Sequence, residues 1–303
     1  MQAVKEWRLS MAVDAVAAAG DGKNIVVATS NLTGSVWEGK VYGIGLGASQ
    51  PLAEIPIECS LADLCPIREG QFLAGCDDGY VRIVHEGAPI PLLGAHNGPV
   101  TAVATSGDTA ASAGTDRMVL LHDLVRLMEL NGIEATRLTA HTSAVNSVDW
   151  SGPMLLTASG DGTVRVWDTR NLANAKPTYS AAVGSMAYCA VFCRNGERIV
   201  AGTEAHELVA FDLRAGATTA LWTEDGFRGP VRKIKACPHN PGLVAVATDT
   251  PSVATVLIDT GKVDKQIFNH RDFVRALAWD ETTPGRLFSG SWDRTVCEIK
   301  VKT

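Results

Sequence analysis

Three sets of side chains in this chain could do chemistry by their residue types. His141, Thr157, Asp161 and Trp167 look like a catalytic or metal-binding cluster, because imidazole, hydroxyl and carboxylate groups serve in both kinds of site. Similar sets occur twice more: His96, Ser112 and Asp116 with His122 at the place of Trp167, and His270, Ser289 and Asp293. What these sets do depends on the secondary-structure elements that bring them together.

Those elements repeat along the chain. Six segments share an apolar strand that ends in small residues, a turn that usually contains Asp, and a second strand: 72–87, 110–125, 155–170, 287–302 and, more faintly, 199–214 and 243–260. Equivalent positions lie 38, 45, 44, 47 and 41 residues apart, at His85, Asp123, Asp168, Asp212, Asp259 and Lys300. A period of about 40–45 residues with four strands in each unit is typical of a β-propeller blade of the WD-repeat type.

The repeats also predict how the ring closes. Six copies from residue 58 onward and the segment 11–57 give seven blades. The last copy stops at Thr303 after its third strand, whereas residues 3–10 have the alternation of an edge strand. An open ring would leave strand edges unpaired. We therefore predict an all-β, seven-bladed WD-repeat propeller that is a single domain over residues 1–303 and is closed by its N-terminal strand.

At WD-repeat spacing, the three sets of side chains are predicted to be structural. The strands of a blade are called a to d from the central channel outward. The Asp of the b–c turn would hold the His of the d–a loop, which would reach the Ser or Thr of strand b and the Trp of strand c. Such networks pair buried polar groups, so we expect neither a catalytic residue nor a metal ligand among them.

Composition and motifs exclude several classes of function. A net charge of −6 and a pI of 5.7 provide no basic field for direct nucleic-acid binding. No dinucleotide loop, nucleophile elbow, phosphate loop or HExxH motif occurs, so we expect no enzyme activity and no cofactor. The cysteines are odd in number and form no CxxC pair, which indicates reduced core residues: Cys59, Cys65, Cys76, Cys189, Cys193, Cys237 and Cys297.

The hydropathy pattern bears on the compartment. No apolar run reaches the ~18 residues of a membrane-spanning helix, and no signal-peptide core follows Lys5 and Arg8. We therefore expect a protein of the cytoplasm and nucleus that does not contact a membrane.

The b–c connection of blade 1 differs from the others. Residues 31–39 are predicted to form a loop that is longer than the turn at 160–163 and projects from the top face, where the b–c and d–a loops lie. Trp37 is near its tip. Two interpretations remain open: Trp37 folds back over a neighbouring loop, or it is an exposed anchor for a partner's pocket. Burying its ~150–250 Å² could supply roughly 4–6 kcal/mol before the costs of association.

Three segments carry a resemblance to a known family. SNLTGSVWEGKVY (30–42), NHRDFVRALAWD (269–280) and GSWDRTV (290–296) resemble the methylosome protein 50 family, the WD-repeat partners of the type II protein arginine methyltransferase. The resemblance extends over all seven blades. It implies that Trp37 enters the N-terminal TIM-barrel domain of the methyltransferase and that Asp77 belongs to the same surface. Family members carry Arg at the position of Ser35, so a charged contact is expected to be lost here.

Ring closure is expected to gather these residues. Blade 1 touches blades 2 and 7, so Trp37, Asp77 and the d–a loop with Arg271, Asp272 and Phe273 would share one sector of the top face. A single partner domain could cover that sector. For the three loop residues, an alternative is a local salt bridge and packing inside the loop.

The resemblance implies a non-catalytic scaffold. It would dock on the methyltransferase in a hetero-oligomer, stabilise it and help to present histones and spliceosomal Sm-type proteins, while the partner carries the methyl-transfer site. The alternative is a generic WD-repeat adaptor, such as a ubiquitin-ligase substrate receptor, in which Trp37 has no special role. A basic ring on the top face would favour a reader of phosphopeptides. An enzymatic propeller would need a polar cluster in the central channel, which the sequence does not indicate.

Overall fold

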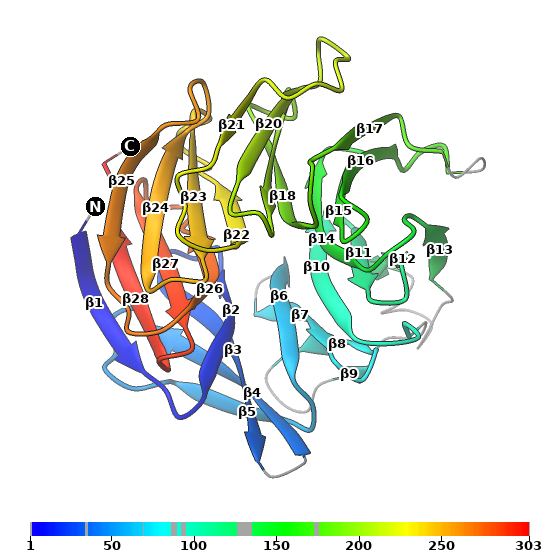
Figure 1. The fold of residues 1–303 in the computed structure, drawn as a ribbon. Helices are drawn as coiled ribbons and strands as arrows, with labels where there is room; N and C mark the ends of the chain where they lie inside the picture. The colour runs from blue at the N-terminus through cyan, green and yellow to red at the C-terminus, as the bar shows by residue number, and fades with distance from the viewer. Residues whose placement is uncertain are drawn as a thin grey trace.

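A computed structural model gives the structure of the protein, and it describes residues 2–33, 36–68, 70–85, 90–91, 95–125, 135–172 and 176–302. Within these ranges the strands form seven four-stranded antiparallel sheets. The sheets are arranged as blades around a common centre (Figure 1). The prediction of a seven-bladed, all-β propeller is confirmed.

The strands of blades 1 to 6 follow the chain order from the centre outward. Blades 1 to 3 contain β2 (Ala12–Ala18), β3 (Asn24–Thr33), β4 (Val36–Gly45) and β5 (Ala53–Ile57); β6 (Leu61–Arg68), β7 (Gln71–Cys76), β8 (Val81–Val84) and β9 (Ile90–Pro91); and β10 (Val100–Ser106), β11 (Thr109–Gly114), β12 (Met118–Asp123) and β13 (Thr136–Thr139). Blades 4 to 6 contain β14 (Val145–Ser151), β15 (Met154–Ser159), β16 (Thr163–Asp168) and β17 (Tyr179–Ala182); β18 (Ala187–Cys193), β19 (Arg198–Thr203), β20 (Leu208–Asp212) and β21 (Trp222–Glu224); and β22 (Val231–Ala236), β23 (Leu243–Thr248), β24 (Ser252–Leu257) and β25 (Val263–Phe268).

Blade 7 joins the two ends of the chain. It consists of β26 (Val274–Trp279), β27 (Arg286–Ser291), β28 (Thr295–Lys300) and, as its outermost strand, β1 (Gln2–Arg8). The antiparallel register runs from Gln2 opposite Lys300 to Arg8 opposite Thr295, and the two termini lie close together in Figure 1. Trp7 of β1 is buried in a cluster with Val13 of β2 and Phe288 of β27. The predicted closure by the N-terminal strand is therefore confirmed.

The small residues that end strand b permit close contact between blades. A Cβ on Gly202 of β19 or on Gly290 of β27 would lie closer than 3.0 Å to Val231 or Val13, respectively. Both valines are fully buried near the start of the next blade's inner strand. Because glycine has no side chain, neighbouring sheets can approach closely enough to pack at the density of a protein core. This explains why the repeat pattern contains small residues there.

The segment 31–39 corrects one prediction, because it is not a loop. Strands β3 and β4 continue as a paired hairpin in which Asn31 lies opposite Glu38, Leu32 opposite Trp37 and Thr33 opposite Val36. The hairpin extends past the ring at the lower edge of Figure 1. β-branched and aromatic residues favour strands, and the two strands are only two residues apart, as in tight hairpins. The intervening residues 34–35, including Ser35, are outside the described residues.

Candidate protein-interaction site

Blade 4 contains a hydrogen-bonded network of the type expected at these positions. His141 Nδ1 lies 2.9 Å from Asp161 Oδ2, and His141 Nε2 lies 2.7 Å from Thr157 Oγ1. Trp167 Nε1 donates to Thr157 Oγ1 at 3.1 Å. Burial acts to raise the pKa of Asp161, but the bonds from Thr163 and His141 and the charge of His141 lower it to about 2. The network therefore contains an ionised carboxylate that holds the d–a loop against the b–c turn.

Blades 3 and 7 contain equivalent networks. His96 bonds Asp116 and Ser112, each at 2.9 Å, and His122 Nε2 reaches Ser112 at 3.0 Å in place of a tryptophan. Burial, with a smaller contribution from His96, lowers the pKa of His122 to about 4. Because the imidazole of His96 is fully enclosed, it is available to hold the loops rather than to meet a substrate.

In blade 7, His270 Nε2 lies 2.8 Å from Ser289 Oγ, and its Nδ1 lies 3.2 Å from Asp293. Thr295 adds a second contact to Nδ1 at 3.0 Å. The side chain of His270 is fully enclosed, so this network too is placed to fix the loops of the top face.

Trp37 is exposed near the start of strand c in blade 1. Its side chain retains 46% of its accessible surface although its backbone is paired with Leu32. A paired strand restricts the backbone, so the indole is held outside the ring with little freedom of the main chain. This exposure is what the anchor interpretation requires.

Asp77 is half-buried beside that hairpin. Its Oδ1 accepts a bond from the backbone N–H of Ser60 at 3.0 Å, and its own N–H donates to the carbonyl of Ser60 at 3.1 Å. Burial is the main cause of a raised pKa for Asp77. The residue therefore ties the b–c turn of blade 2 to the loop that enters it, and only part of the carboxylate faces outward.

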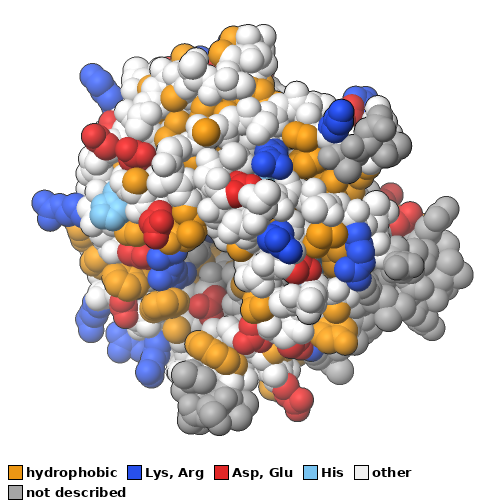
Figure 2. Space-filling view, turned by 45° about the vertical axis from the view of Figure 1, so that its right-hand side comes forward, with side chains coloured by type: hydrophobic (Ala, Val, Ile, Leu, Met, Phe, Trp, Pro, Cys, Tyr) orange, Lys and Arg blue, Asp and Glu red, His pale blue; other side chains and the backbone are white. Residues whose placement is uncertain are grey.

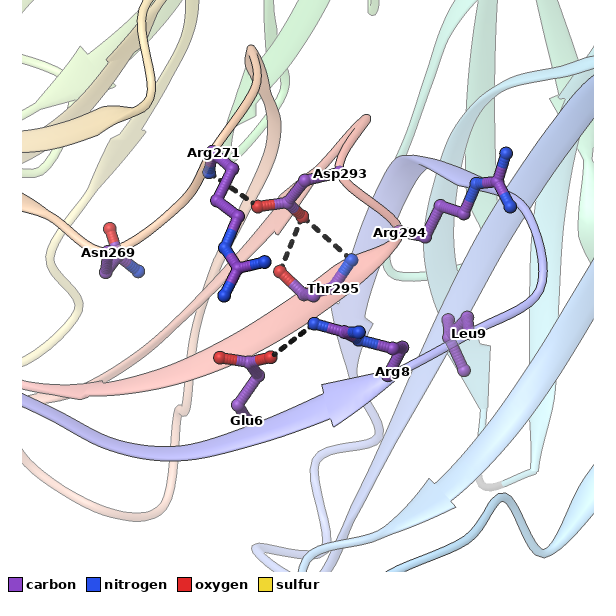
Figure 3. Close-up of a pocket in the computed structure, with 8 residues that line it drawn as sticks. All are labelled: Glu6, Arg8, Leu9, Asn269, Arg271, Asp293, Arg294 and Thr295. Atoms are coloured by element: carbon purple, nitrogen blue, oxygen red, sulfur yellow. Dashed lines mark hydrogen bonds and ion pairs between the residues drawn. The ribbon is translucent and has the colours of Figure 1, made fainter.

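The d–a loop before blade 7 is fixed through its backbone. The N–H of Arg271 donates to Asp293 at 2.7 Å, and the guanidinium points into a cavity of about 250 Å³ whose lining includes Glu6 and Arg8 (Figure 3). Asp272 accepts a bond from the N–H of Phe273 at 2.7 Å. No ion pair between Arg271 and Asp272 is found in the described part of the loop. The hydrogen bonds of this loop are thus made through its backbone, while Arg271 and Phe273 stay exposed and the ring of Phe273 lies beside that of Trp292.

This sector contains two further exposed aromatic residues, which the sequence alone does not identify. Tyr80 in the b–c turn of blade 2 is 43% exposed, and Trp292 in the b–c turn of blade 7 is 40% exposed. The ring centroids of Trp292 and Phe273 are 6.0 Å apart. We call Trp37, Tyr80, Phe273 and Trp292 the aromatic surface. In the sequence, Tyr80 and Trp292 could be recognised as aromatic residues in the same b–c turn as the recurring Asp.

The aromatic surface occupies three adjacent blades. Its four members lie at loops or strand ends of the top face in blades 7, 1 and 2. The fifth exposed aromatic side chain among the described residues, Phe268, ends the outer strand of blade 6. On the face drawn in Figure 2, basic, acidic and hydrophobic side chains are interleaved without a continuous field of one charge. Exposed aromatic rings on the loops of neighbouring blades, as in the aromatic surface, are typical of sites that bind proteins.

The central channel contradicts one expectation. The sequence indicated no polar cluster there, yet Lys233 Nζ lies 2.7 Å from Asp63 Oδ1, and Asp14, Arg232 and Arg275 line the same region. These residues come from different blades. Each lies alone in an ordinary strand pattern, so only the ring brings them together.

A cysteine cluster lies next to the hairpin. Cys59, Cys76 and Asp78 place ligand-type atoms within 4.8 Å of one another, and all seven cysteines are free. Arg82 Nη1 donates to Asp78 at 2.9 Å and lies 3.6 Å from Cys59 Sγ. The hydrogen bond between the two sulfurs raises the pKa of Cys59 and lowers that of Cys76. The positive charge in this cluster is the guanidinium of Arg82, so its geometry gives no argument for a metal ion.

Comparisons with known proteins identify WD repeats. The model described as WD domain, G-beta repeat matches residues 132–168 and 261–297. The methylosome protein WDR77 of Xenopus laevis is 22% identical over 292 residues, which cover 90% of this chain and 84% of that protein.

Other relatives are WD-repeat proteins with different names. Striatin-4 of Homo sapiens is 28% identical over 229 residues, which cover 70% of this chain and 30% of striatin-4. The protein SEC13 homolog of Drosophila melanogaster is 32% identical over 147 residues, or 40% of this chain and 38% of its own. The chain thus spans well under half the length of these two relatives.

The described part of the chain contains no helix of the length and apolarity needed to cross a bilayer. The closed ring of seven four-stranded sheets makes this chain a β-propeller, and its residues 132–168 and 261–297 match the model of the WD repeat.

Proposed function

We propose that this propeller is a non-catalytic scaffold that docks on a type II protein arginine methyltransferase through the aromatic surface. The observation that carries the proposal is Trp37, which is held exposed on a paired hairpin in blade 1, while both neighbouring blades carry exposed aromatic residues in loops of the top face. The sequence resemblance of residues 30–42 and 269–280, and the similarity to WDR77 over 90% of the chain, support the choice of partner.

Docking would be a rigid-body event. The hairpin restricts the backbone at Trp37 before the partner arrives, so little conformational entropy is lost on binding. Trp37 would fill a pocket in the partner's N-terminal TIM-barrel domain, and Phe273 and Arg271 would contact the same domain from blade 7. Asp77 would act chiefly by fixing the turn beside the hairpin. Buried aromatic anchors of this kind commonly dominate the affinity of an interface.

In such a complex the propeller would stabilise the methyltransferase and help to present histones and Sm-type proteins. The methyl-transfer chemistry and its cofactor would belong to the partner. The hetero-oligomer would act in the cytoplasm and nucleus. Ser35, where the family carries Arg, would contribute no ionic contact.

A generic WD-repeat adaptor is the second candidate. It is favoured by the similarity to striatin-4 and to the SEC13 homolog, whose names do not refer to methylation. In that case a substrate or a scaffold protein would bind elsewhere on the top face, and Trp37 would not determine partner choice.

Binding of a purified type II arginine methyltransferase, measured by surface plasmon resonance, tests the proposal. Trp37→Ala should abolish binding or weaken it by at least about 30-fold, as expected of an anchor worth over about 2 kcal/mol. Phe268→Ala is the matched control, because this more exposed aromatic residue lies in the outer strand of blade 6. Both variants should melt like the wild type. Equal binding by all three proteins, or capture of other partners only from a native lysate, would favour the generic adaptor.

A further inference from the structure

A repeated β-bulge determines which residues face the mouth of the central channel. In every inner strand the pairing register shifts near its start, as between Val13 and Ala15 in blade 1 and between Val274 and Ala276 in blade 7. The bulged residues form what we call the channel mouth: Asp14, Ala62, Thr101, Asn146, Tyr188, Arg232 and Arg275. They line a cavity of about 450 Å³ together with Trp292 and Lys233. Bulges commonly re-aim side chains in this way.

Charge is distributed unequally around the channel mouth. Arg232 and Arg275 lie in the adjacent blades 6 and 7 and share one carboxylate: Asp249 is 2.9 Å from Arg232 Nε and 3.2 Å from Arg275 Nη2. Lys233 is already paired with Asp63. The buried Nε of Arg275 has no hydrogen-bond partner among the described residues. The two guanidiniums share the carboxylate of Asp249, and the charge of Asp14 also acts on Arg275. N–H groups such as Arg275 Nε nevertheless remain without an acceptor among the described residues.

The aromatic faces at the channel mouth are already covered by cations. The guanidinium of Arg232 lies 3.9 Å from the ring centroid of Tyr188, and that of Arg275 lies 4.3 Å from Trp292. An arginine side chain from a substrate would need such faces for stacking, and here it would meet like charge. Stacking occupies the planes of the guanidiniums but leaves N–H groups at their edges, which suit carboxylate or phosphate oxygens.

Asp14, the acid of the channel mouth, lies in blade 1 next to the blade of Arg275 and is occupied within the protein. Asp14 accepts a hydrogen bond from Ser30 Oγ and another from Trp292 Nε1, the latter at 3.1 Å. Its burial is the main cause of a pKa raised to about 6. A carboxylate that is already hydrogen-bonded on both oxygens, and on which the charge of Arg275 acts, makes a poor receptor for an incoming cation.

We propose that the channel mouth binds an acidic side chain, either a carboxylate or a phosphoryl group, on a peptide segment of a partner protein, with Arg232 and Arg275 as its donors. The proposal is independent of the methyltransferase interface, although Trp292 contributes to both regions. It also implies that arginine-rich substrate tails do not enter the channel.

Fluorescence anisotropy with three labelled peptides of the same length tests this site. The peptides alternate glycine with glutamate, with phosphoserine or with arginine. The wild type should bind one or both acidic peptides and not the arginine peptide. Arg275→Gln and Arg232→Gln should each weaken acidic-peptide binding by about tenfold or more, as expected for lost charge-assisted hydrogen bonds. Arg137→Gln is the matched control, because Arg137 is exposed on the outer strand of blade 3.

Asp14→Asn separates an effect of charge from a disturbance of the fold, because it should strengthen binding rather than weaken it. Asparagine can keep both hydrogen bonds of Asp14 but removes the negative charge, so acidic peptides should bind about two- to fivefold more tightly. Trp37→Ala should leave peptide binding unchanged, which separates this site from the methyltransferase interface.

Three results would overturn the proposal. In the first, the wild type and both Arg→Gln variants bind the acidic peptides equally well. In the second, the arginine peptide binds and Asp14→Asn abolishes that binding. In the third, no peptide shows saturable binding up to about 1 mM, which is an affinity too weak to matter. Inorganic phosphate is the competitor. If it binds as tightly as the acidic peptides do, the channel mouth is a site for small anions and the peptide proposal fails.

Discussion

Trp167 and Trp37 both lie on strand c of a blade, yet their environments are opposite. Trp167, near the end of β16 in blade 4, is 1% exposed and donates its N–H to Thr157. Trp37, near the start of β4 in blade 1, is 46% exposed on a hairpin that continues past the ring. Position along the strand, rather than residue type, decides which tryptophan holds the fold and which is available to a partner.

The two blades also stabilise their top loops differently. Blade 4 uses the ionised Asp161 to hold a buried histidine, whereas blade 1 places the buried Asp14 against Ser30 and Trp292. The pKa of Asp161 is depressed to about 2, and that of Asp14 is raised to about 6. The carboxylate of blade 4 should therefore stabilise the fold in its charged form, and that of blade 1 in its neutral form.

Trp167→Ala should produce the largest effect. It removes a fully buried ring and leaves the hydroxyl of Thr157 without its indole donor, so we expect a loss of about 3–5 kcal/mol in the free energy of unfolding. Urea denaturation followed by circular dichroism measures it. A loss below about 1 kcal/mol would mean that the core around blade 4 collapses onto the cavity, and the contrast between the two tryptophans would then be weaker than their exposure suggests.

Asp161→Asn tests the charged network of blade 4. At pH 7 we expect a loss of about 1.5–3 kcal/mol, the range for hydrogen bonds to a charged group. The native pKa of about 2 lies below the ordinary 3.8, so the stabilising effect is complete above pH 3.8 and is lost as the pH falls toward 2. Urea denaturation across this range should show the wild type and the variant converging.

The matched control for that experiment is Asp168→Asn. Asp168 bonds Arg170 at the surface, where solvent screens the pair. The Asp168→Asn substitution should leave the free energy of unfolding nearly unchanged at every pH. If both variants lose the same stability, the burial of the blade 4 network is not what makes its carboxylate important.

Asp14→Asn should have the opposite pH dependence. Because the pKa of Asp14 is about 6 in the folded protein and its ordinary value is 3.8, the folded state binds the extra proton between these values. Wild-type stability therefore falls as the pH rises from 4 to 6, and the variant should gain about 1–3 kcal/mol relative to the wild type over that interval. A constant difference between the two proteins from pH 4 to pH 8 would show that Asp14 titrates normally.

The sequence predicted the features that depend on local repeats. The spacing of His141, Thr157 and Asp161 indicated their network, and the missing last strand of blade 7 indicated closure by the N-terminus. The sequence predicts a loop at the extended hairpin, because the b–c turns of the other blades are about four residues long. Its β-branched and aromatic residues carried the signal for strands.

The channel mouth could not be predicted in the same way. Arg232 and Arg275 belong to different blades, and the bulges that aim them inward depend on tertiary packing. The role of Tyr188 and Trp292 at the channel mouth likewise depends on the guanidiniums that lie over their rings. The bulge position recurs once in each blade, but the residue type at that position changes from blade to blade, so the repeat pattern does not distinguish the two arginines.

Trp37→Ala should have the smallest effect on the fold. The exposed indole contributes little to the core, and its strand pairing uses only the backbone, so the free energy of unfolding should change by less than about 0.5 kcal/mol. The same urea denaturation used for Trp167→Ala measures it. A loss above about 1 kcal/mol would mean that the indole packs on a neighbouring loop in solution, and the anchor interpretation would fail. A small loss combined with lost binding to the methyltransferase would show that the indole contributes to the interface and not to the stability of the monomer.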